Sequence, residues 1–315
     1  MPRHEFDVQN LELKPIRIPG GCKCWWLGPP WIVAHALQTR QQGASVQTAV
    51  LAARHFQETN MVQRSFIIPV LSMSTDERLN ITGLLEDLAA IDGEVICIFN
   101  NETVFEQLRQ HPRVDKFCFN KLNAGVSRSW NMGINLVESP TAFVINQDVH
   151  VAPEALLQME TYLHSLPKAV MVAPQGSYLD FTQLRIIHYF QKGGFDRPVL
   201  THDVSGFLFA IHMERFQGHQ LQFDTRYSPC FMEEWDMGVQ VMKAGLACYT
   251  VPVTAFEHEW GISGEKENTP IHYLGKTVFR HDVLLENRRK FMQKWFGPQM
   301  PDAPADLGQP GSAAS

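Results

Sequence analysis

The fold is decided by a stretch in the middle of the chain, Phe143-Val144-Ile145-Asn146-Gln147-Asp148-Val149, where an apolar run ends on polar residues and an acid. The apolar part is typical of a buried β-strand, and Ala152-Pro153-Glu154 then begins a helix. Open α/β sheets bind ligands outside the carboxyl ends of their strands, so Asp148 is placed to hold a divalent cation. The alternative is that Asp148 only caps the following helix.

Apolar runs alternate with amphipathic segments on either side of this stretch. In the first half, strands are expected at 65–70, 94–99, 116–119 and 142–145, and helices at 76–91, 104–110 and 127–137. Further strands are expected at 170–172, 206–211 and 247–251, with helices at 233–244 and 275–295. This alternation predicts an α/β fold with a mostly parallel central sheet flanked by helices.

Composition narrows the class of protein. The chain has 315 residues, of which 44% are apolar, so it can bury one large core or two modest ones. Its formal charge of −6 argues against nucleic acid as a partner. No apolar run approaches the ~18 residues that span a bilayer, and the first residues lack the apolar core of a signal peptide. We therefore expect a cytoplasmic protein, and its six scattered cysteines are expected to be free thiols.

Shifts in composition divide the chain. We expect an N-terminal extension at 1–60, a core domain at 61–265, a C-terminal helical segment at 266–297 and a disordered tail at 298–315. The core domain itself divides into a regular first part, 61–150, and a less regular second part, 151–265. The extension gathers cysteine, proline and tryptophan between Cys22 and Trp31. These residues either pack against the core or contact a membrane surface or a partner subunit.

A turn that contains glycine opens the helix expected at 127–137. The turn is Asn123-Ala124-Gly125, and the helix carries Asn131 and Gly133 on its first two turns. Small residues let the backbone approach a ligand, and the free N–H groups of a helix start favour phosphate. The alternative is an ordinary helix cap.

Three carboxylates lie within four residues, in Glu233-Glu234-Trp235-Asp236. Acids at a helix start are usually a solvated first turn. Here Phe231, Met232 and Trp235 would shield at least one acid from water. Loss of solvent raises the pKa of a carboxyl group toward neutrality, which suits a general base.

A histidine follows the last of the expected strands. His258 precedes a loop that contains Gly261, Ser263 and Gly264. A lone histidine is more often a packing or surface residue, but one at a strand end beside a small-residue loop is placed to close over a metal-bound phosphate.

Taken in order, these motifs resemble a known enzyme family. The order is Ile67-Ile68-Pro69, Ile96-Cys97-Ile98-Phe99-Asn100-Asn101, Asn123-x-Gly125, Asn131-x-Gly133, Asn146-Gln147-Asp148, Ser205-Gly206, Phe223-Asp224, Glu233-Glu234-x-Asp236, Gly245 and His258. It resembles the inverting, metal-dependent glycosyltransferases of family 2, which have the GT-A fold, a Rossmann-like nucleotide-diphospho-sugar transferase fold. The rhamnosyltransferase-like branch is the most similar, and the resemblance covers about residues 64–265.

The resemblance implies roles for particular residues. Asp148 and His258 would hold Mn²⁺ or Mg²⁺, and Glu234 would be the general base, with Glu233 and Asp236 orienting the base or the donor sugar. The expected contacts to the nucleotide sugar are Pro69, Asn100, Asn123, Gly125, Asn131, Asn146, Gln147, Asp203, Ser205 and Gly206. Acceptor contacts are expected from Tyr227, Trp235 and Trp260.

The resemblance also implies a reaction. One sugar would move from a UDP-, dTDP- or GDP-sugar to a hydroxyl of a glycan or a lipid-linked glycan, in bacterial-type polysaccharide, lipopolysaccharide or glycoconjugate synthesis, either in the cytoplasm or at the inner face of the membrane. A Gln-x-x-Arg-Trp motif of polymer-building members is missing, which favours a single transfer. Asn146 stands where the family usually has a first acid, so metal binding would rest on Asp148, His258 and the donor's phosphates. The alternative function is a non-catalytic sugar-nucleotide-binding or scaffold domain.

Overall fold

The computed structural model describes residues 63–73, 76, 78–258 and 268–297. The expectations for the extension at 1–60, for the tail at 298–315 and for Trp260 lie outside these residues. Within the described part, no helix combines the length and apolarity that crossing a bilayer requires.

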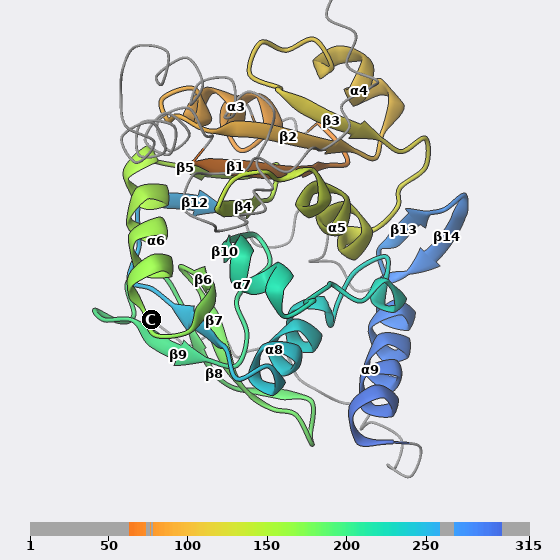
Figure 1. The fold of residues 1–315 in the computed structure, drawn as a ribbon. Coiled ribbons are helices and arrows are strands. Elements are labelled where there is room, and N and C mark those ends of the chain that lie inside the picture. Colours follow the sequence, from red (N-terminus) through yellow and green to blue (C-terminus); the bar gives the residue numbers. More distant parts are fainter. Residues whose placement is uncertain (1–62, 74–75, 77, 259–267, 298–315) are drawn as a thin grey trace, which may run out of the picture. The chain divides into compact units, whose positions relative to one another are not determined.

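An eight-stranded sheet forms the centre of the described residues (Figure 1). Its strands are β1 (Arg64–Val70), β2 (Glu94–Phe99), β3 (Lys116–Phe119), β4 (Thr141–Ile145), β6 (Ala169–Ala173), β9 (Val199–Thr201), β10 (Leu208–His212) and β11 (Ala247–Thr250). They follow the order β3-β2-β1-β4-β10-β6-β11-β9. β10 runs antiparallel to both of its neighbours, β9 runs antiparallel to β11, and the remaining pairs are parallel. The predicted mostly parallel sheet is confirmed.

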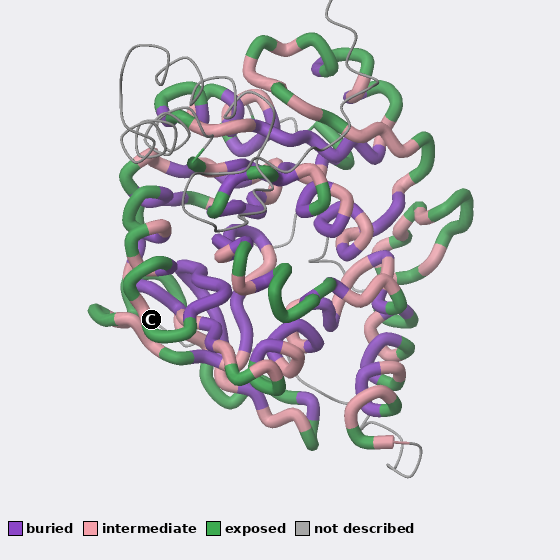
Figure 2. Tube along the Cα trace, viewed as in Figure 1, coloured by how far each residue is buried: buried purple, intermediate pink, exposed green. Residues whose placement is uncertain are grey.

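The inner strands are buried on both faces (Figure 2). Successive side chains of a strand point to opposite faces. In β1, Phe66 and Ile68 therefore enter one hydrophobic cluster, whereas Ile67 enters the other. This burial on both sides explains why β1, β2 and β4 are continuous apolar runs in the sequence.

Helices cover both faces of the sheet. α3 (Ile81–Leu88), α4 (Glu102–Leu108) and α6 (Pro153–Ser165) contribute to the cluster that contains Phe66. α5 (Val126–Leu136), α7 (Met213–Gly218) and α8 (Glu233–Lys243) contribute to the cluster that contains Ile67. Asn80 and Asn101 cap α3 and α4 through their side-chain oxygens, as residues at helix starts commonly do.

Several short elements complete the described part. β5 (Val149–Val151) pairs with β12 (Phe256–His258), β7 (Gly176–Asp180) pairs with β8 (Arg185–Phe190), and β13 (Pro270–Tyr273) pairs with β14 (Lys276–Phe279). A short 3₁₀ helix, η1, spans Thr225–Tyr227, and the last helix, α9, spans Arg280–Phe296. Phe291 and Met292 of α9 pack with Tyr227, Met232 and Leu184 in a third cluster.

The prediction of a helix over 275–295 was wrong at its start. The segment forms the β13–β14 hairpin first, and α9 begins only at Arg280. Leu274 and Gly275 have φ angles of 47° and 75°, the left-handed pair that a two-residue hairpin turn needs. The 266–297 segment is therefore a hairpin followed by a helix, and the helix expected at 76–91 is shortened to α3.

Candidate active site

Asp148 and His258 meet at the carboxyl edge of the sheet. Asp148 lies in the turn between β4 and β5, and His258 ends β12, which pairs with β5 so that His258 is opposite Val149. The His258 Nε2 and Asp148 Oδ1 atoms are 3.7 Å apart, and both side chains are mostly buried. The His258 ring stacks on Phe207 with ring centroids 4.4 Å apart. Two residues 110 positions apart in the sequence are thus held side by side.

This pair has the chemistry of a partial metal site. Burial raises the pKa of Asp148, and the neighbouring His258 opposes that shift. Burial lowers the pKa of His258, which favours the neutral imidazole that binds metals. Within the described residues, no group of three or more His, Cys, Asp or Glu side chains could hold an ion. One carboxylate and one imidazole fit a Mn²⁺ or Mg²⁺ ion that takes its other ligands from substrate phosphates and water.

The three carboxyl groups of the acidic turn have different surroundings. Asp236 is fully buried and accepts hydrogen bonds from Tyr227, Gln240 and Trp295. It also forms an ion pair with Lys294 of α9 at 2.7 Å. Asp236 therefore joins α8 to α9 and has its oxygens occupied by protein groups.

Glu233 is enclosed without such partners. Only 2% of the residue is exposed, and its Oε2 atom has no hydrogen-bond partner. Burial and then the nearby Glu234 raise the pKa of Glu233 well above its usual value. Glu233 is thus closed off from solvent, and its ionised form is disfavoured by burial and by the neighbouring carboxylate.

Glu234 is the only one of the three residues that is not fully enclosed, although its carboxyl group is deeply placed. Its carboxylate lies on Gly206 and accepts a hydrogen bond from the Gly206 backbone N–H. A Cβ atom on Gly206 would overlap Glu234 Oε1 and lie 2.8 Å from Trp130 Cη2, so only glycine leaves room for this carboxylate. Burial raises the pKa of Glu234 to about 7. Glu234 is therefore able to take a proton near neutral pH.

A buried polar network supports the loop that carries Gly206. Asp203 accepts hydrogen bonds from the backbone N–H and the hydroxyl of Ser177, at 2.7 and 2.6 Å. Burial raises the pKa of Asp203 to about 6. Ser205 and Tyr189 share a hydrogen bond of 2.8 Å, and the Tyr189 hydroxyl also donates to Gln175. The loop before β10 is thus fixed to the β7–β8 hairpin.

A cavity of about 810 Å³ lies beside this edge of the sheet. It brings together four residues predicted to bind the nucleotide sugar, Pro69, Asn100, Asn123 and Gly125. The wall also includes the β13–β14 hairpin, Pro229-Cys230-Phe231, the start of α4 and the start of α5. The cavity is within the usual range for small-molecule sites, roughly 300–1,000 Å³.

The asparagines of this region hold backbone in place. Asn100 accepts from the Ala124 backbone N–H at 3.0 Å and donates to Ser129. Asn123 donates to the His272 carbonyl at 2.9 Å, which fixes the hairpin to the turn before α5. Asn131 bonds to both backbone groups of Phe223 and lies away from the residues that line the cavity.

Close packing limits what the start of α5 can bind. The first N–H of the helix, from Val126, donates to the Pro229 carbonyl at 2.8 Å. Gly125 has a φ angle of 83°, and a Cβ there would lie 2.9 Å from Pro229 Cα. The glycine is thus required by the turn and by the chain that crosses it.

The residues before Asp148 connect neighbouring loops. Gln147 accepts from the Leu71 backbone N–H at 2.7 Å and donates to the Ser72 carbonyl. Asn146 donates its backbone N–H to Phe207. Both residues therefore shape the loops at the carboxyl ends of β1 and β4.

The structure places the two described acceptor candidates away from the cavity wall. Tyr227 is 1% exposed, and its hydroxyl donates to Asp236. Trp235 packs against Phe291 of α9 with ring centroids 6.5 Å apart. Both residues connect the acidic turn to α9.

Sequence reasoning missed several residues of this site, namely Gln175, Tyr189, Arg128 and the tip of the β13–β14 hairpin. Arg128 donates to the Ala124 carbonyl and to the Tyr273 hydroxyl, so it links α5 to the hairpin. The run Arg185–Phe190 is rich in β-branched and aromatic residues, which is a strand signal. Most of its side chains are exposed, so the strand does not show the alternation of apolar and polar residues that a half-buried strand would show.

Comparison with known proteins supports the fold. No protein-family model matches the chain, and no curated protein matches it. Among solved structures, GalNAc-T7 with UDP, GalNAc and Mn²⁺ matches 75% of this chain with a TM-score of 0.55 and 12% identity. The match covers 48% of GalNAc-T7, so the chain spans about half the length of that protein.

Two structures of S. aureus TarS match more weakly. The 1–349 fragment and a longer TarS chain each cover 62% of this chain with TM-scores of 0.42, at 13% and 14% identity. With the strand order described above, the GalNAc-T7 likeness confirms that the described residues have the GT-A fold.

Proposed function

We propose that the chain is an inverting, metal-dependent glycosyltransferase that moves one sugar from a nucleoside-diphosphate sugar to an acceptor hydroxyl. One observation carries the proposal: the dipeptide Gly206-Phe207 contacts both halves of a reaction centre. Gly206 supports the Glu234 carboxylate, and Phe207 stacks on His258 beside Asp148. A base and a metal site held by adjacent residues are what a single in-line displacement on a sugar phosphate requires.

Each part of the site would have a distinct task. The cavity beside Asn100 and Asn123 would hold the nucleoside, which directs the diphosphate toward Asp148 and His258. A cation bound there would neutralise the diphosphate as its bond to the sugar breaks. Glu234 would remove the proton from the acceptor hydroxyl as that oxygen attacks the anomeric carbon from the opposite side. The attack from the opposite side inverts the anomeric configuration.

The finer assignment is part of the same proposal. We place the chain in the rhamnosyltransferase-like branch of glycosyltransferase family 2, with a UDP-, dTDP- or GDP-sugar donor. A glycan or lipid-linked glycan acceptor would serve bacterial-type polysaccharide or glycoconjugate synthesis, in the cytoplasm or at the inner membrane face. Residues 61–150 and 151–265 would be the donor and acceptor halves of one domain. The ordered motifs of the sequence support this assignment.

Substitution at the two ends of the reaction centre tests the proposal. Purified full-length chain is incubated with Mn²⁺ and a panel of UDP-, dTDP- and GDP-sugars, and release of nucleoside diphosphate is measured. We expect Asp148→Ala and Glu234→Gln each to lower the rate at least 100-fold. Glu86→Gln is the matched control, because Glu86 is exposed on α3.

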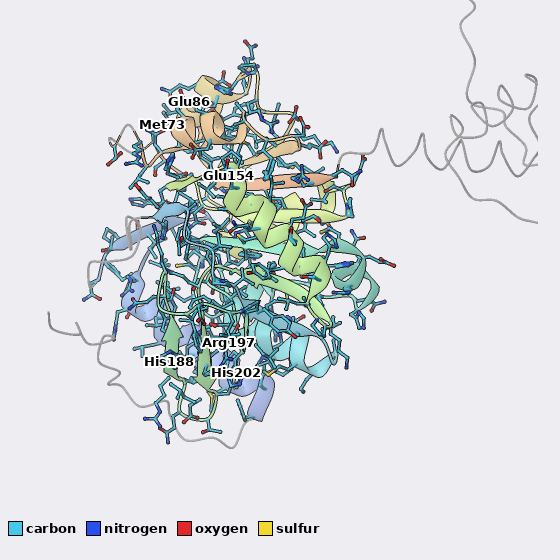
Figure 3. All side chains as sticks on the ribbon, turned by 90° about the vertical axis from the view of Figure 1, so that its left-hand side faces the viewer. Met73, Glu86, Glu154, His188, Arg197 and His202 are labelled. Atoms are coloured by element: carbon cyan, nitrogen blue, oxygen red, sulfur yellow. The ribbon has the colours of Figure 1, made fainter. Side chains whose placement is uncertain are left out.

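Figure 3 shows Glu86 far across the view from His202, the residue that precedes Asp203. The control substitution is therefore remote from the network around Gly206 and should leave the rate unchanged. Turnover that survives both Asp148→Ala and Glu234→Gln would contradict the catalytic role. Nucleotide-sugar binding without any turnover would instead indicate a binding or scaffold domain.

A further inference from the structure

A second, smaller cavity has His258 on its wall. Its volume is about 310 Å³, at the lower end of the usual range for ligand sites, which is roughly 300–1,000 Å³. The wall includes Gln175, Gln191, Lys192, Phe207, Phe256 and His258. These residues come from the β7–β8 side of the molecule and from β12, and they include none of the wall of the larger cavity.

This smaller cavity borders both ends of the proposed reaction centre. Phe207 and His258, stacked on each other, lie on its wall next to the Asp148 pair. Gln175 belongs to the same wall, and through Tyr189 it connects to Ser205, the neighbour of Gly206. A molecule in this cavity would therefore lie close to the sugar that is transferred.

The lining has the composition of a saccharide site. Phe207 and Phe256 lie on the wall with ring centroids 5.6 Å apart, and the exposed parts of the two residues, 5% and 4%, offer a sugar ring a small apolar surface. Gln175 and Gln191 offer amide groups, each able to donate to and accept from hydroxyls. Gln191 makes no side-chain hydrogen bond within the part of the chain that the structure describes. Its amide is thus available to a ligand.

Lys192 gives the cavity an uncompensated positive charge. Its Nζ atom donates to the Phe256 carbonyl at 2.5 Å and lies 5.0 Å from the centre of the Phe256 ring. The one carboxylate on the cavity wall, Glu257, is paired with Arg78 at 3.0 Å. Lys192 forms no ion pair with any described residue. Two of its three N–H donors remain for a ligand.

We infer that this cavity binds the acceptor as a saccharide that carries an anionic group, a carboxylate or a phosphate, next to Lys192. The inference rests on the proposed function, because it places the acceptor hydroxyl beside the proposed reaction centre. The apolar surface of the two aromatic rings and the two glutamine amides favour a sugar ring. The free ammonium group adds the selection for charge, since a hydrogen bond to an ion is about twice as strong as a neutral one.

Binding of matched saccharides tests the inference. Calorimetry on the full-length chain compares cellobiouronic acid with cellobiose, and glucose 6-phosphate with glucose, in the presence of UDP and Mn²⁺. We expect at least one anionic saccharide to bind about tenfold more tightly than its neutral partner. Lys192→Gln should remove that preference and leave the neutral saccharide unchanged, and Lys192→Arg should retain it.

Lys168→Gln is the matched control. Lys168 is exposed and directly precedes β6, at the opposite end of that strand from Gln175. This substitution should preserve the preference for the anionic saccharide. Equal binding of anionic and neutral saccharides by the unaltered chain would overturn the inference.

The same titrations show whether Lys192 binds the acceptor or the donor. If Lys192→Gln weakens the binding of UDP with Mn²⁺ and leaves saccharide binding unchanged, the lysine serves the donor's diphosphate and the inference is wrong. Failure of the proposed function has a different signature. In that case the chain turns over no nucleotide sugar, while the dependence of saccharide binding on Lys192 is measured independently of turnover.

Discussion

Glu234 is distinguished from Glu233 and Asp236 by what surrounds each carboxyl group. Glu233 is enclosed and Asp236 is occupied by four donors, whereas Glu234 is only partly enclosed and accepts hydrogen bonds from the backbone N–H groups of Gly206 and of Glu234 itself. A carboxylate held by backbone donors alone has no side-chain cation or hydroxyl that competes with a substrate proton. The choice of base therefore follows from neighbours rather than from position in the acidic run.

The pH profile of the reaction should report Glu234. A base accepts a proton only when it is ionised, and the pKa of Glu234 is raised by burial to about 7. We expect kcat/KM to rise with pH up to about 7 and then to level, whereas an ordinary glutamate would give a rise near 4.3. Rates are measured from pH 5 to 9 at constant Mn²⁺. A rise centred below pH 5 would contradict the role of Glu234.

The same burial should weaken the fold as Glu234 ionises. Its raised pKa means that the native state holds the proton more tightly than the unfolded chain, so the free energy of unfolding falls as pH rises from about 4 to about 7. Glu234→Gln stays neutral, so at pH 7.5 its free energy of unfolding should exceed that of the unaltered chain by about 1–3 kcal/mol, and it should unfold at a higher temperature. The difference should disappear near pH 4. Thermal unfolding at both pH values checks this.

A methyl group added at Gly206 should move the Glu234 carboxylate away from the Gly206 backbone N–H. A Cβ there overlaps Glu234 Oε1 and presses on Trp130, so Gly206→Ala should displace the carboxylate. We expect kcat to fall more than tenfold and stability to fall by about 1–3 kcal/mol. Gly218→Ala is the control, because a Cβ on Gly218 meets nothing within 4 Å. Equal kinetics for the two variants would exclude this role for Gly206.

Among the elements, α9 holds the acidic turn from outside the sheet. Asn287 donates to the carbonyls of Tyr227, Cys230 and Phe231, and Lys294 pairs with both Asp224 and Asp236. The Trp295 ring nitrogen also donates to Asp236. The helix thus fixes η1 and the start of α8, from which Glu233 and Glu234 project.

Removing the cation of this helix should destabilise the turn. Lys294→Met leaves Asp236 buried without its counter-ion, so we expect a loss of about 3 kcal/mol in urea unfolding together with a lower kcat. Arg289→Ala is the control on the same helix, because its ion pair with Glu286 is exposed and contributes less than about 1 kcal/mol. Similar losses for the two variants would show that α9 does not hold the acidic turn through Lys294.

The accuracy of the sequence analysis differed between the two halves of the fold for a physical reason. β1, β2 and β4 are buried on both faces, so each is an apolar run in the sequence. The helices α3 and α4, which precede β2 and β3, begin at capping asparagines that the sequence also shows. β5, β9 and β12 have three residues each, too few for any period to be read. The turn at Leu274-Gly275 lacks the usual Asn-Gly signal, so the hairpin was not predicted and β14 was assigned to the following helix.

At the scale of the whole molecule, the candidate site follows from topology. Asp148, Asn100 and Pro69 lie at the carboxyl ends of parallel strands, and that edge is where the sequence predicted a ligand site. The contacts that give the site its chemistry could not be predicted in this way. The contact of Glu234 with Gly206 and the hydrogen bond between Tyr189 and Ser205 join different segments of the chain. How close these segments lie in space depends on tertiary packing.

The small number of protein ligands at the metal site should make the binding of Mn²⁺ and the binding of nucleoside diphosphate depend on each other. Because the described residues hold no cluster of three or more metal-binding side chains, a cation held by Asp148 and His258 would lack most of its ligands until a diphosphate arrives. Because coupling between two ligands is reciprocal, Mn²⁺ should tighten nucleoside diphosphate binding by the same factor as the nucleotide tightens Mn²⁺ binding. We expect a factor of about ten or more, measured by calorimetry with each ligand titrated in the absence and presence of the other. Asp148→Ala should remove the coupling, and Asp92→Asn, at an exposed position before β2, should preserve it. Tight Mn²⁺ binding by the chain without nucleotide would show that further protein ligands complete the site, and the metal would then belong to the protein before the donor arrives.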